Sequence, residues 1–159
     1  MGSGKTTIGR EVAIHYKFPF FDCDAMIEKN EKMQINDIFK RQGECYFREK
    51  ETELLSTLSL ATSSIISTGG GSITNQQNQQ LIQKLGQVIY LHCDFLTLMN
   101  RVANEKQNRP LLKNNTDEVI ETLFKKRLLL YRRIASIEID TTNLSINRVV
   151  TEVIEKVSV

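Results

Sequence analysis

The sequence predicts an α/β fold in which helices cover both faces of a parallel sheet. Four short apolar runs, each bounded by turn or polar residues, lie at residues 18–22, 64–67, 88–92 and 137–140 and predict strands. The longer segments between these runs carry apolar residues three and four positions apart, which is typical of amphipathic helices. Because helices alternate with short buried strands, the pattern favours parallel β-α units.

Five helices are predicted from this spacing, and a loop separates two of them. The defining residues are Ile8, Val12, Ala13 and Tyr16; Phe47, Leu54 and Leu55; Leu81, Ile82 and Leu85; Val119, Leu123, Arg127 and Leu130; and Val149, Val150, Val153 and Ile154. The amide-rich run at 75–80 opens the third helix. Residues 105–115 are polar and interrupted by Pro110, so they predict a mobile loop before the fourth helix.

Composition limits the classes of protein to which the chain can belong. Its 159 residues fit one domain, and 40% apolar and 25% charged residues exclude disorder and a collagen-like fibre. The 21 Lys and Arg residues against 19 Asp and Glu give a net charge of +2, which is not concentrated in one segment and gives no support for nucleic-acid binding. No apolar run could span a membrane or serve as a signal peptide. We therefore expect a soluble, cytoplasmic protein.

Three cysteines are spread along the chain, at Cys23, Cys45 and Cys93. Their odd number, wide spacing and lack of a Cys-x-x-Cys pair argue against a disulfide framework and against a zinc site. We expect reduced and mostly buried thiols.

The segment Gly2-Ser3-Gly4-Lys5-Thr6-Thr7 has the composition of a phosphate-binding loop. Glycines let successive backbone N–H groups turn toward phosphate oxygens, a lysine reaches the β and γ phosphates, and a hydroxyl binds Mg²⁺. The helix that follows adds its N-terminal dipole. Two other interpretations are a glycine-rich helix cap without a ligand and a coincidental match to the N-myristoylation pattern.

The complete pattern G-x-x-x-x-G-K-[ST] would place its first glycine two residues before Met1. A phosphate loop normally follows the carboxyl end of a central strand. We therefore expect that the sequence is truncated or starts at an internal methionine, so that the first central strand of the sheet is missing.

Two carboxylates, Asp22 and Asp24, come at the end of the first apolar run. At the end of a strand they face the same side, because residues two apart in a strand share a face. The carboxyl ends of parallel strands are where open α/β sheets bind ligands. One acid could hold Mg²⁺ and the other could orient or deprotonate a substrate hydroxyl. A solvated strand end with a helix cap is the alternative.

Further charged and glycine residues have the same two interpretations, ligand binding or ordinary surface structure. Arg48 lies between Glu44 and Glu51 at helical spacing, which also suits an exposed ion-pair ladder. Gly69, Gly70 and Gly71 follow the strand at 64–67 and would allow close approach of a ligand, although a plain turn is possible. Arg109 in the polar loop could close over phosphates, and Arg127 could pair with a carboxylate.

Taken in order, these motifs resemble those of the shikimate kinases, which belong to the nucleoside-monophosphate-kinase-like P-loop proteins. The matching segments are 2–9, 21–24 with Ile27-Glu28, Ile38-Phe39, 43–51, 69–71, 109–112, and Arg127 with Leu130-Tyr131 and Ala135. The resemblance implies a three-layer α/β/α P-loop kinase fold with a parallel sheet. It also implies one kinase domain over residues 1–159, with a mobile lid around 105–115.

The resemblance assigns roles to individual residues. Gly2, Ser3, Gly4, Lys5, Thr6, Thr7 and Arg109 are expected to bind ATP, with Thr6 and Asp22 holding Mg²⁺. Asp24, Arg48, Gly69, Gly70, Gly71 and Arg127 are expected to bind shikimate, with the two arginines on its carboxylate. Lys5, Asp24 and Arg109 are the expected catalytic residues.

The activity implied by the resemblance is transfer of the ATP γ-phosphate to the 3-hydroxyl of shikimate, a step toward chorismate and the aromatic amino acids, by a monomer. Two alternatives stay open: a related small-molecule kinase of the gluconate type, and a nucleotide-binding domain without catalysis. The presence of Asp24, Arg48, Arg109 and Arg127 together argues against the second.

Overall fold

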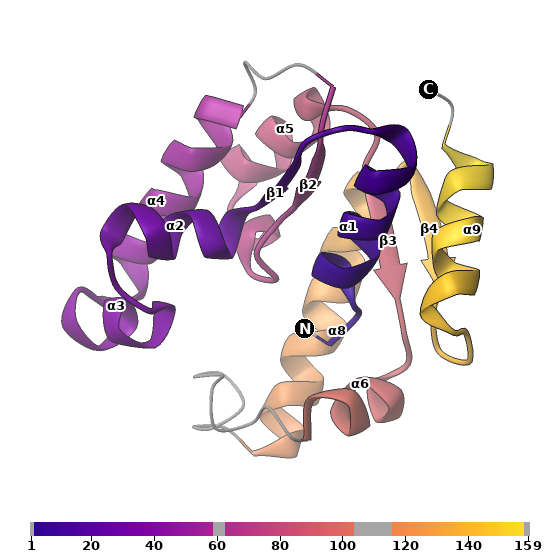
Figure 1. Cartoon of the computed structure of the whole chain (residues 1–159). Coiled ribbons are helices and arrows are strands. Elements are labelled where there is room, and N and C mark those ends of the chain that lie inside the picture. The colour runs from indigo at the N-terminus through magenta and orange to yellow at the C-terminus, as the bar shows by residue number, and fades with distance from the viewer. Residues whose placement is uncertain (1, 59–62, 104–115, 158–159) are drawn as a thin grey trace. The chain divides into compact units, whose positions relative to one another are not determined.

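The computed structural model describes residues 2–58, 63–103 and 116–157 (Figure 1). The chain divides into two compact units. One unit is Thr6–Gly86, and the other combines Met1–Lys5 with Gln87–Val159. In the Thr6–Gly86 unit, candidate site residues lie at or after the carboxyl-terminal ends of the short parallel strands.

The Thr6–Gly86 unit is built around the parallel pair β1 (Phe20–Asp22) and β2 (Ile65–Ser67). Phe20 pairs with Ile65 and Asp22 with Ser67, so both strands end at the same edge. The helices of this unit are α1 (Lys5–Tyr16, from Thr6 on), α2 (Cys23–Glu31), α3 (Ile35–Arg41), α4 (Gly43–Leu58) and α5 (Gln76–Leu85), with the 3₁₀ turn η1 (Ser72–Thr74) after β2.

Local sequence signals explain where the helices of this unit begin and end. The Asp22 carboxylate caps α2 and the Asn75 side chain accepts a hydrogen bond from the Gln77 N–H to cap α5. Helix α2 ends at Lys32, which has a positive φ of 52°. The buried apolar residues of the unit are Ile8, Val12, Ala13, Ile27, Ile38, Phe47, Leu54, Leu55, Leu58, Ile73 and Ile82. The unit therefore has a core of its own, against which the site residues are fixed.

The second unit is also built around a pair of parallel strands. Strands β3 (Ile89–His92) and β4 (Ile137–Asp140) pair in parallel, and the helices are α6 (Phe95–Val102), α8 (Asp117–Ile134) and α9 (Ile146–Lys156). Its core contains Leu91, Cys93, Leu98, Val102, Ile120, Ile134, Ile139, Val149 and Val153. Asp94 caps α6, accepting from both the N–H and the hydroxyl of Thr97.

The four predicted strands and five predicted helices are all present, and the strand pairing is parallel as predicted. Helices α2, α3 and α6 were not predicted, because seven to nine residues contain barely two turns of apolar periodicity. Cys23 and Cys93 are buried and Cys45 is exposed, all as free thiols, which agrees with the expectation for the cysteines. In the part of the chain that the structure describes, no helix has the length and apolarity needed to cross a membrane.

Candidate active site

The phosphate loop has the backbone geometry that its sequence predicts. Gly2 and Gly4 have positive φ values of 60° and 80°, and α1 begins directly after them at Lys5. Left-handed glycines beside a helix N-terminus allow backbone N–H groups to converge on an anion. Gly2 is also required for packing, since a Cβ there would lie 2.7 Å from Val102 Cγ1. Ser3 is buried.

Thr6 and Asp22, the two predicted metal ligands, are in direct contact. The Thr6 hydroxyl donates to Asp22 Oδ2 at 2.6 Å, while Asp22 Oδ1 accepts from the Ala25 N–H at 3.2 Å. Asp22 is therefore both a helix cap and a partner of the phosphate-loop helix. A hydroxyl and one carboxylate are hard oxygen ligands that suit Mg²⁺, which takes its remaining ligands from water and phosphates. Among the described residues no group of three His, Cys, Asp or Glu side chains could hold a metal ion without such help.

The position of Asp24 differs from the prediction. Strand β1 ends at Asp22, and Asp24 lies in the first turn of α2, so the alternation of a strand does not place these two carboxylates on one face. Asp24 instead approaches the glycine loop. A Cβ on Gly69 would lie 2.8 Å from Asp24 Oδ1. The helical turn thus brings Asp24 to the loop that follows β2.

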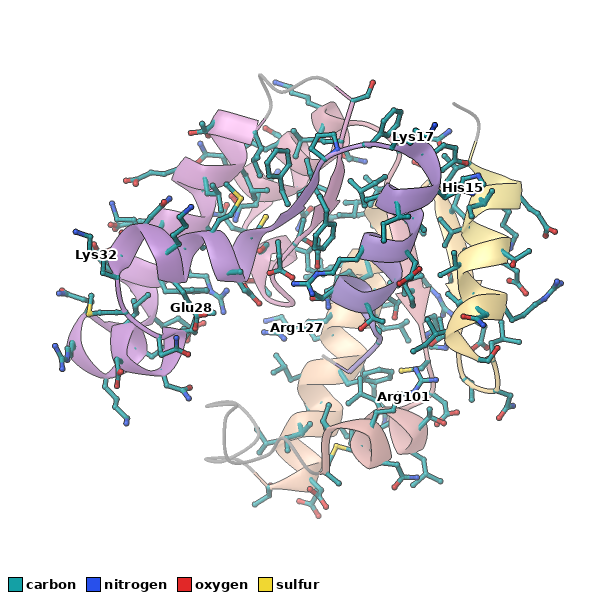
Figure 2. All side chains as sticks on the ribbon, in the orientation of Figure 1. His15, Lys17, Glu28, Lys32, Arg101 and Arg127 are labelled. Atoms are coloured by element: carbon teal, nitrogen blue, oxygen red, sulfur yellow. The ribbon has the colours of Figure 1, made fainter. Side chains whose placement is uncertain are left out.

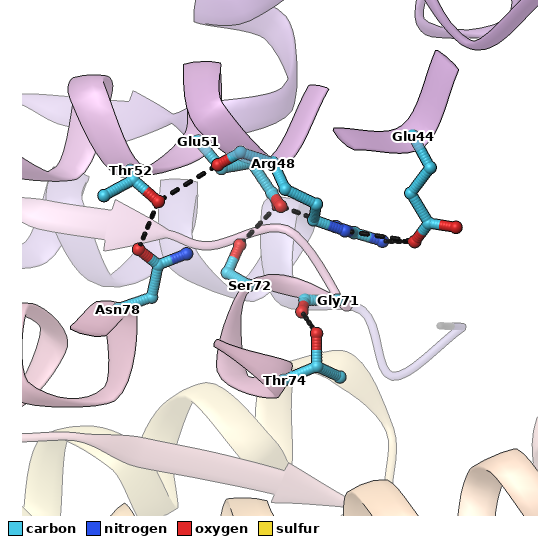
Figure 3. Close-up of polar contacts among 8 residues, drawn as sticks. All are labelled: Glu44, Arg48, Glu51, Thr52, Gly71, Ser72, Thr74 and Asn78. Carbon is cyan, nitrogen blue, oxygen red and sulfur yellow. Dashed lines mark hydrogen bonds and ion pairs between the residues drawn. The ribbon is translucent and has the colours of Figure 1, made fainter. Parts of the chain in front are cut away.

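Arg48 is held between two acids of its own helix, as the spacing predicts (Figure 3). Its Nη2 donates to Glu44 Oε1 at 2.9 Å and its Nη1 donates to Glu51 Oε2 at 2.5 Å. Burial alone would lower the pKa of the Arg48 guanidinium, but the Glu51 and Glu44 carboxylates outweigh it and raise that pKa. The exposed fractions of these acids differ greatly, 58% for Glu44 and 1% for Glu51. The interpretation as a fully exposed ladder is therefore wrong for Glu51.

Gly69 and Gly71 lie against the charged side chains of Asp24, Glu51 and Arg48. A Cβ on Gly69 would lie 2.5 Å from Glu51 Oε1, and one on Gly71 would lie 2.5 Å from both terminal nitrogens of Arg48. A side chain at either position would require these charged groups to move. The structure brings Asp24, Arg48, Gly69 and Gly71 together within one unit.

Arg127 belongs to the other unit, where it lies in α8 and is only 7% exposed (Figure 2). A buried arginine in the middle of a helix is unusual and points to a specific role. The same unit contains Arg101, whose guanidinium donates to the hydroxyl and carbonyl oxygens of Thr141 at 2.9 and 2.6 Å. Arg109 and the predicted lid around 105–115 lie outside the described residues.

Two residues that contact this group of side chains, Glu51 and Ser72, were not among the predicted site residues. Glu51 is on the same helical stripe as Phe47, Leu54 and Leu55, and an acid on an apolar stripe is a signal of a buried ion pair. Ser72 donates its hydroxyl to Glu51 Oε1 at 2.5 Å. Nothing in the sequence distinguishes this serine from the others except its place directly after the three glycines.

The sequence matches one family of known proteins along nearly its whole length. The family model described as shikimate kinase matches residues 1–158. The chain is 42% identical to the shikimate kinase of Dictyoglomus turgidum, over 98% of this chain and 92% of that protein. It is 41% identical to the shikimate kinase of Enterococcus faecalis, over 98% and 93% respectively.

Solved structures show the same similarity. A shikimate kinase from Acinetobacter baumannii, in complex with shikimate, matches with a TM-score of 0.92 and 33% identity over 98% of this chain and 87% of that one. A shikimate kinase from Bacteroides thetaiotaomicron matches with a TM-score of 0.86 and 29% identity over 98% and 92%. These matches confirm the predicted α/β/α P-loop kinase fold. The chain belongs to the shikimate kinase family.

Proposed function

We propose that this chain transfers the γ-phosphate of ATP to the 3-hydroxyl of shikimate, giving ADP and shikimate 3-phosphate. The observation that carries the proposal is the cluster in which Asp24 and Arg48 meet the loop of Gly69 and Gly71. An acid and an arginine at one point suit a ligand that has both a hydroxyl and a carboxylate. Membership of the shikimate kinase family supports this choice of ligand.

The acceptor half of the reaction is assigned to the Thr6–Gly86 unit. Arg48 would bind the shikimate carboxylate, a charge-assisted contact that fixes one end of the ring. Asp24 would accept a hydrogen bond from the 3-hydroxyl and take its proton as the oxygen attacks the γ-phosphorus. Gly69, Gly70 and Gly71 would let the ring approach the backbone. We also assign Arg127 to the shikimate carboxylate, on the resemblance and its burial.

The nucleotide half is assigned to the phosphate loop, Gly2 to Thr7. Backbone N–H groups and the Lys5 ammonium would hold the phosphates, so that positioning and charge neutralisation carry most of the catalysis. Thr6 and Asp22 would hold Mg²⁺. When bound, that ion offsets the charge on the β and γ phosphates.

The lid is proposed from the resemblance alone. Arg109 would contact the ATP phosphates from the segment 105–115. Closure of this lid would exclude water and limit wasteful hydrolysis of ATP. On this proposal residues 1–159 act as one kinase domain.

Product identification tests the proposal. The purified chain is incubated with MgATP and, in separate samples, shikimate, gluconate or no acceptor, and the products are analysed by ³¹P NMR and mass spectrometry. We expect one new phosphate monoester, on the 3-oxygen of shikimate, in the shikimate sample only. A phosphorylated gluconate, or phosphate on another hydroxyl of shikimate, would contradict the assignment.

A further inference from the structure

Glu51 is a buried carboxylate with two defined partners (Figure 3). It is 1% exposed, its Oε2 accepts from Arg48 Nη1 and its Oε1 accepts from the Ser72 hydroxyl, each at 2.5 Å. Ser72 is also 1% exposed. A buried carboxylate is costly unless its oxygens are satisfied, so both contacts are needed to keep Glu51 in one orientation.

The two acids that contact Arg48 differ in how firmly they can hold it. Glu44 is 58% exposed, and an ion pair with an exposed acid restrains a side chain weakly. Glu51 is enclosed, so its orientation decides where the Arg48 guanidinium lies. That guanidinium lies close to Gly71, where an added Cβ would be 2.5 Å from both terminal nitrogens.

Ser72 connects this pair to the loop that follows β2. It is the first residue of η1, and its N–H donates to the Gly69 carbonyl oxygen at 3.2 Å. A Cβ on Gly69 would lie 3.1 Å from Ser72 Oγ, so the hydroxyl is directly over the glycine loop. The hydroxyl therefore ties the glycine loop to the acid that orients Arg48 on α4.

We propose that Ser72 is a positioning residue for the acceptor: its hydroxyl fixes Glu51, and Glu51 in turn fixes Arg48 in the orientation that binds the substrate carboxylate. The inference rests on the proposed function, because it assigns that carboxylate to Arg48. Ser72 itself need not contact the substrate. Its effect should accordingly depend on whether the acceptor carries a carboxylate.

The test compares wild type with Ser72→Ala on two acceptors, shikimate and its methyl ester, which keeps the hydroxyls but lacks the charge. For Ser72→Ala we expect kcat/KM for shikimate to fall by about five- to tenfold, mostly through KM, and kcat/KM for the ester to change by less than about twofold. The KM for ATP should not change. A merely structural defect would lower both acceptor values together.

Thr52→Val is the matched control. Thr52 Oγ1 lies 2.8 Å from Asn78 Oδ1 and 3.0 Å from the Arg48 carbonyl oxygen, and it does not contact the Glu51 carboxylate (Figure 3). This variant removes a half-buried hydroxyl beside Glu51 and leaves the side-chain contacts of Ser72, Glu51 and Arg48 in place. The melting temperatures of the two variants are compared, and kcat/KM for shikimate in Thr52→Val should equal that of wild type.

Glu51→Gln changes the acid of the same contact instead of the serine. Its side chain keeps its size but is neutral, and one of the two acceptor oxygens becomes an NH₂ group, so the charge-assisted contact with Arg48 is weakened. It should also raise the KM for shikimate more than the KM for ATP. This second variant tests the chain of contacts from Ser72 through Glu51 to Arg48 even if Ser72→Ala folds poorly.

The outcomes are distinguishable. Active wild type with a carboxylate-dependent loss in Ser72→Ala supports the inference. Active wild type with unchanged shikimate kinetics in Ser72→Ala, or with equal losses on shikimate and its ester, overturns the role of Ser72 and leaves the proposed function standing. Wild type that does not phosphorylate shikimate overturns the proposed function, and the inference falls with it.

Discussion

The Arg48 guanidinium lies against the Cα of Gly71 so closely that a methyl group there would be 2.5 Å from both terminal nitrogens. The glycine is therefore required by the side chain of another element. Glu51 and Glu44 hold Arg48 on α4, so the contact connects α4 with the loop after β2. In our account this contact shapes the carboxylate end of the acceptor site.

Gly71→Ala should displace Arg48 and weaken the acceptor site without affecting the nucleotide site. We expect KM for shikimate to rise by about tenfold or more, the loss typical of one charge-assisted contact, with KM for ATP unchanged. Steady-state kinetics with each substrate varied in turn would measure both values. An unchanged KM for shikimate would show that the position of Arg48 does not determine binding.

Gly86→Ala is a contrasting glycine substitution. Gly86 ends α5 with a φ of 145°, and a Cβ there would meet nothing within 4 Å. The penalty is backbone strain only, so the free energy of unfolding should fall by about 1–3 kcal/mol while both KM values stay the same. Urea unfolding followed by circular dichroism gives the first quantity. A change in shikimate kinetics here would mean that glycine substitutions act on the site through general destabilisation.

Asp24→Asn should separate chemistry from nucleotide binding. The amide keeps the size of the side chain but cannot take a proton from the acceptor hydroxyl, so kcat should fall by about 10² or more. ATP binding, measured by isothermal titration calorimetry, should be nearly intact. Retained turnover would rule out the assigned role of Asp24.

Asp94→Ala tests the cap of α6, which is distant in sequence from the acceptor cluster. Asp94 accepts from the N–H and the hydroxyl of Thr97 at 2.7 and 2.9 Å, so its loss should lower the free energy of unfolding. Asp94→Ser retains a capping hydroxyl and should cost less. No loss of stability in Asp94→Ala would show that the cap contributes nothing.

The same contacts make the contribution of Asp94 depend on pH. Hydrogen bonds from the backbone and side chain of Thr97 lower the pKa of Asp94 below its usual 3.8. A depressed folded-state pKa stabilises the protein above the unfolded-state value and loses that effect as pH falls below it. The difference in stability between wild type and Asp94→Ala should therefore shrink as the pH is lowered through 4 and below.

The thiol of Cys23 gives a prediction at the opposite end of the pH scale. Burial, followed by the nearby carboxylates of Asp24, Asp22 and Glu51, raises its pKa from 9.0 to about 12. A raised folded-state thiol pKa favours the folded chain below pH 9 and loses that effect as the pH rises toward 12. Stability should fall over this range, and Cys23→Ala should reduce the fall.

Thiol reactivity provides an independent check. Cys23 and Cys93 are buried with raised pKa values, whereas Cys45 is exposed. In the native chain at pH 8, a thiol reagent should modify Cys45 rapidly and the other two only on unfolding. Mass spectrometry of peptides after brief labelling identifies the site. Rapid labelling of Cys23 would contradict its burial beside the carboxylates.

The elements that the sequence predicted well are those with long periodic patterns or a strong local motif. The phosphate loop needs only its own glycines and the helix after it, so the local sequence is enough to predict the loop from Gly2 to Thr6. The positions of site residues that depend on the packing of separate elements were harder to predict. Asp24 was predicted at a strand end, but β1 stops at Asp22, whose carboxylate caps a helix that the periodicity was too short to reveal.

Ser72 illustrates the limit more sharply. A serine after three glycines is compatible with any turn, and its role arises only because α4 brings Glu51 to 2.5 Å from its hydroxyl. Likewise, Glu44 and Glu51 have similar positions around Arg48 in the sequence but exposed fractions of 58% and 1%. Local spacing predicts that such residues pair, whereas packing decides which pair is buried.

The most direct test of the account is the rate of ADP release from MgATP by the purified chain, with and without shikimate, together with a thermal melt of the same sample. The account predicts a cooperative melt and ADP release that depends on shikimate and saturates with its concentration. A cooperatively folded chain that releases no ADP in the presence of shikimate would contradict it.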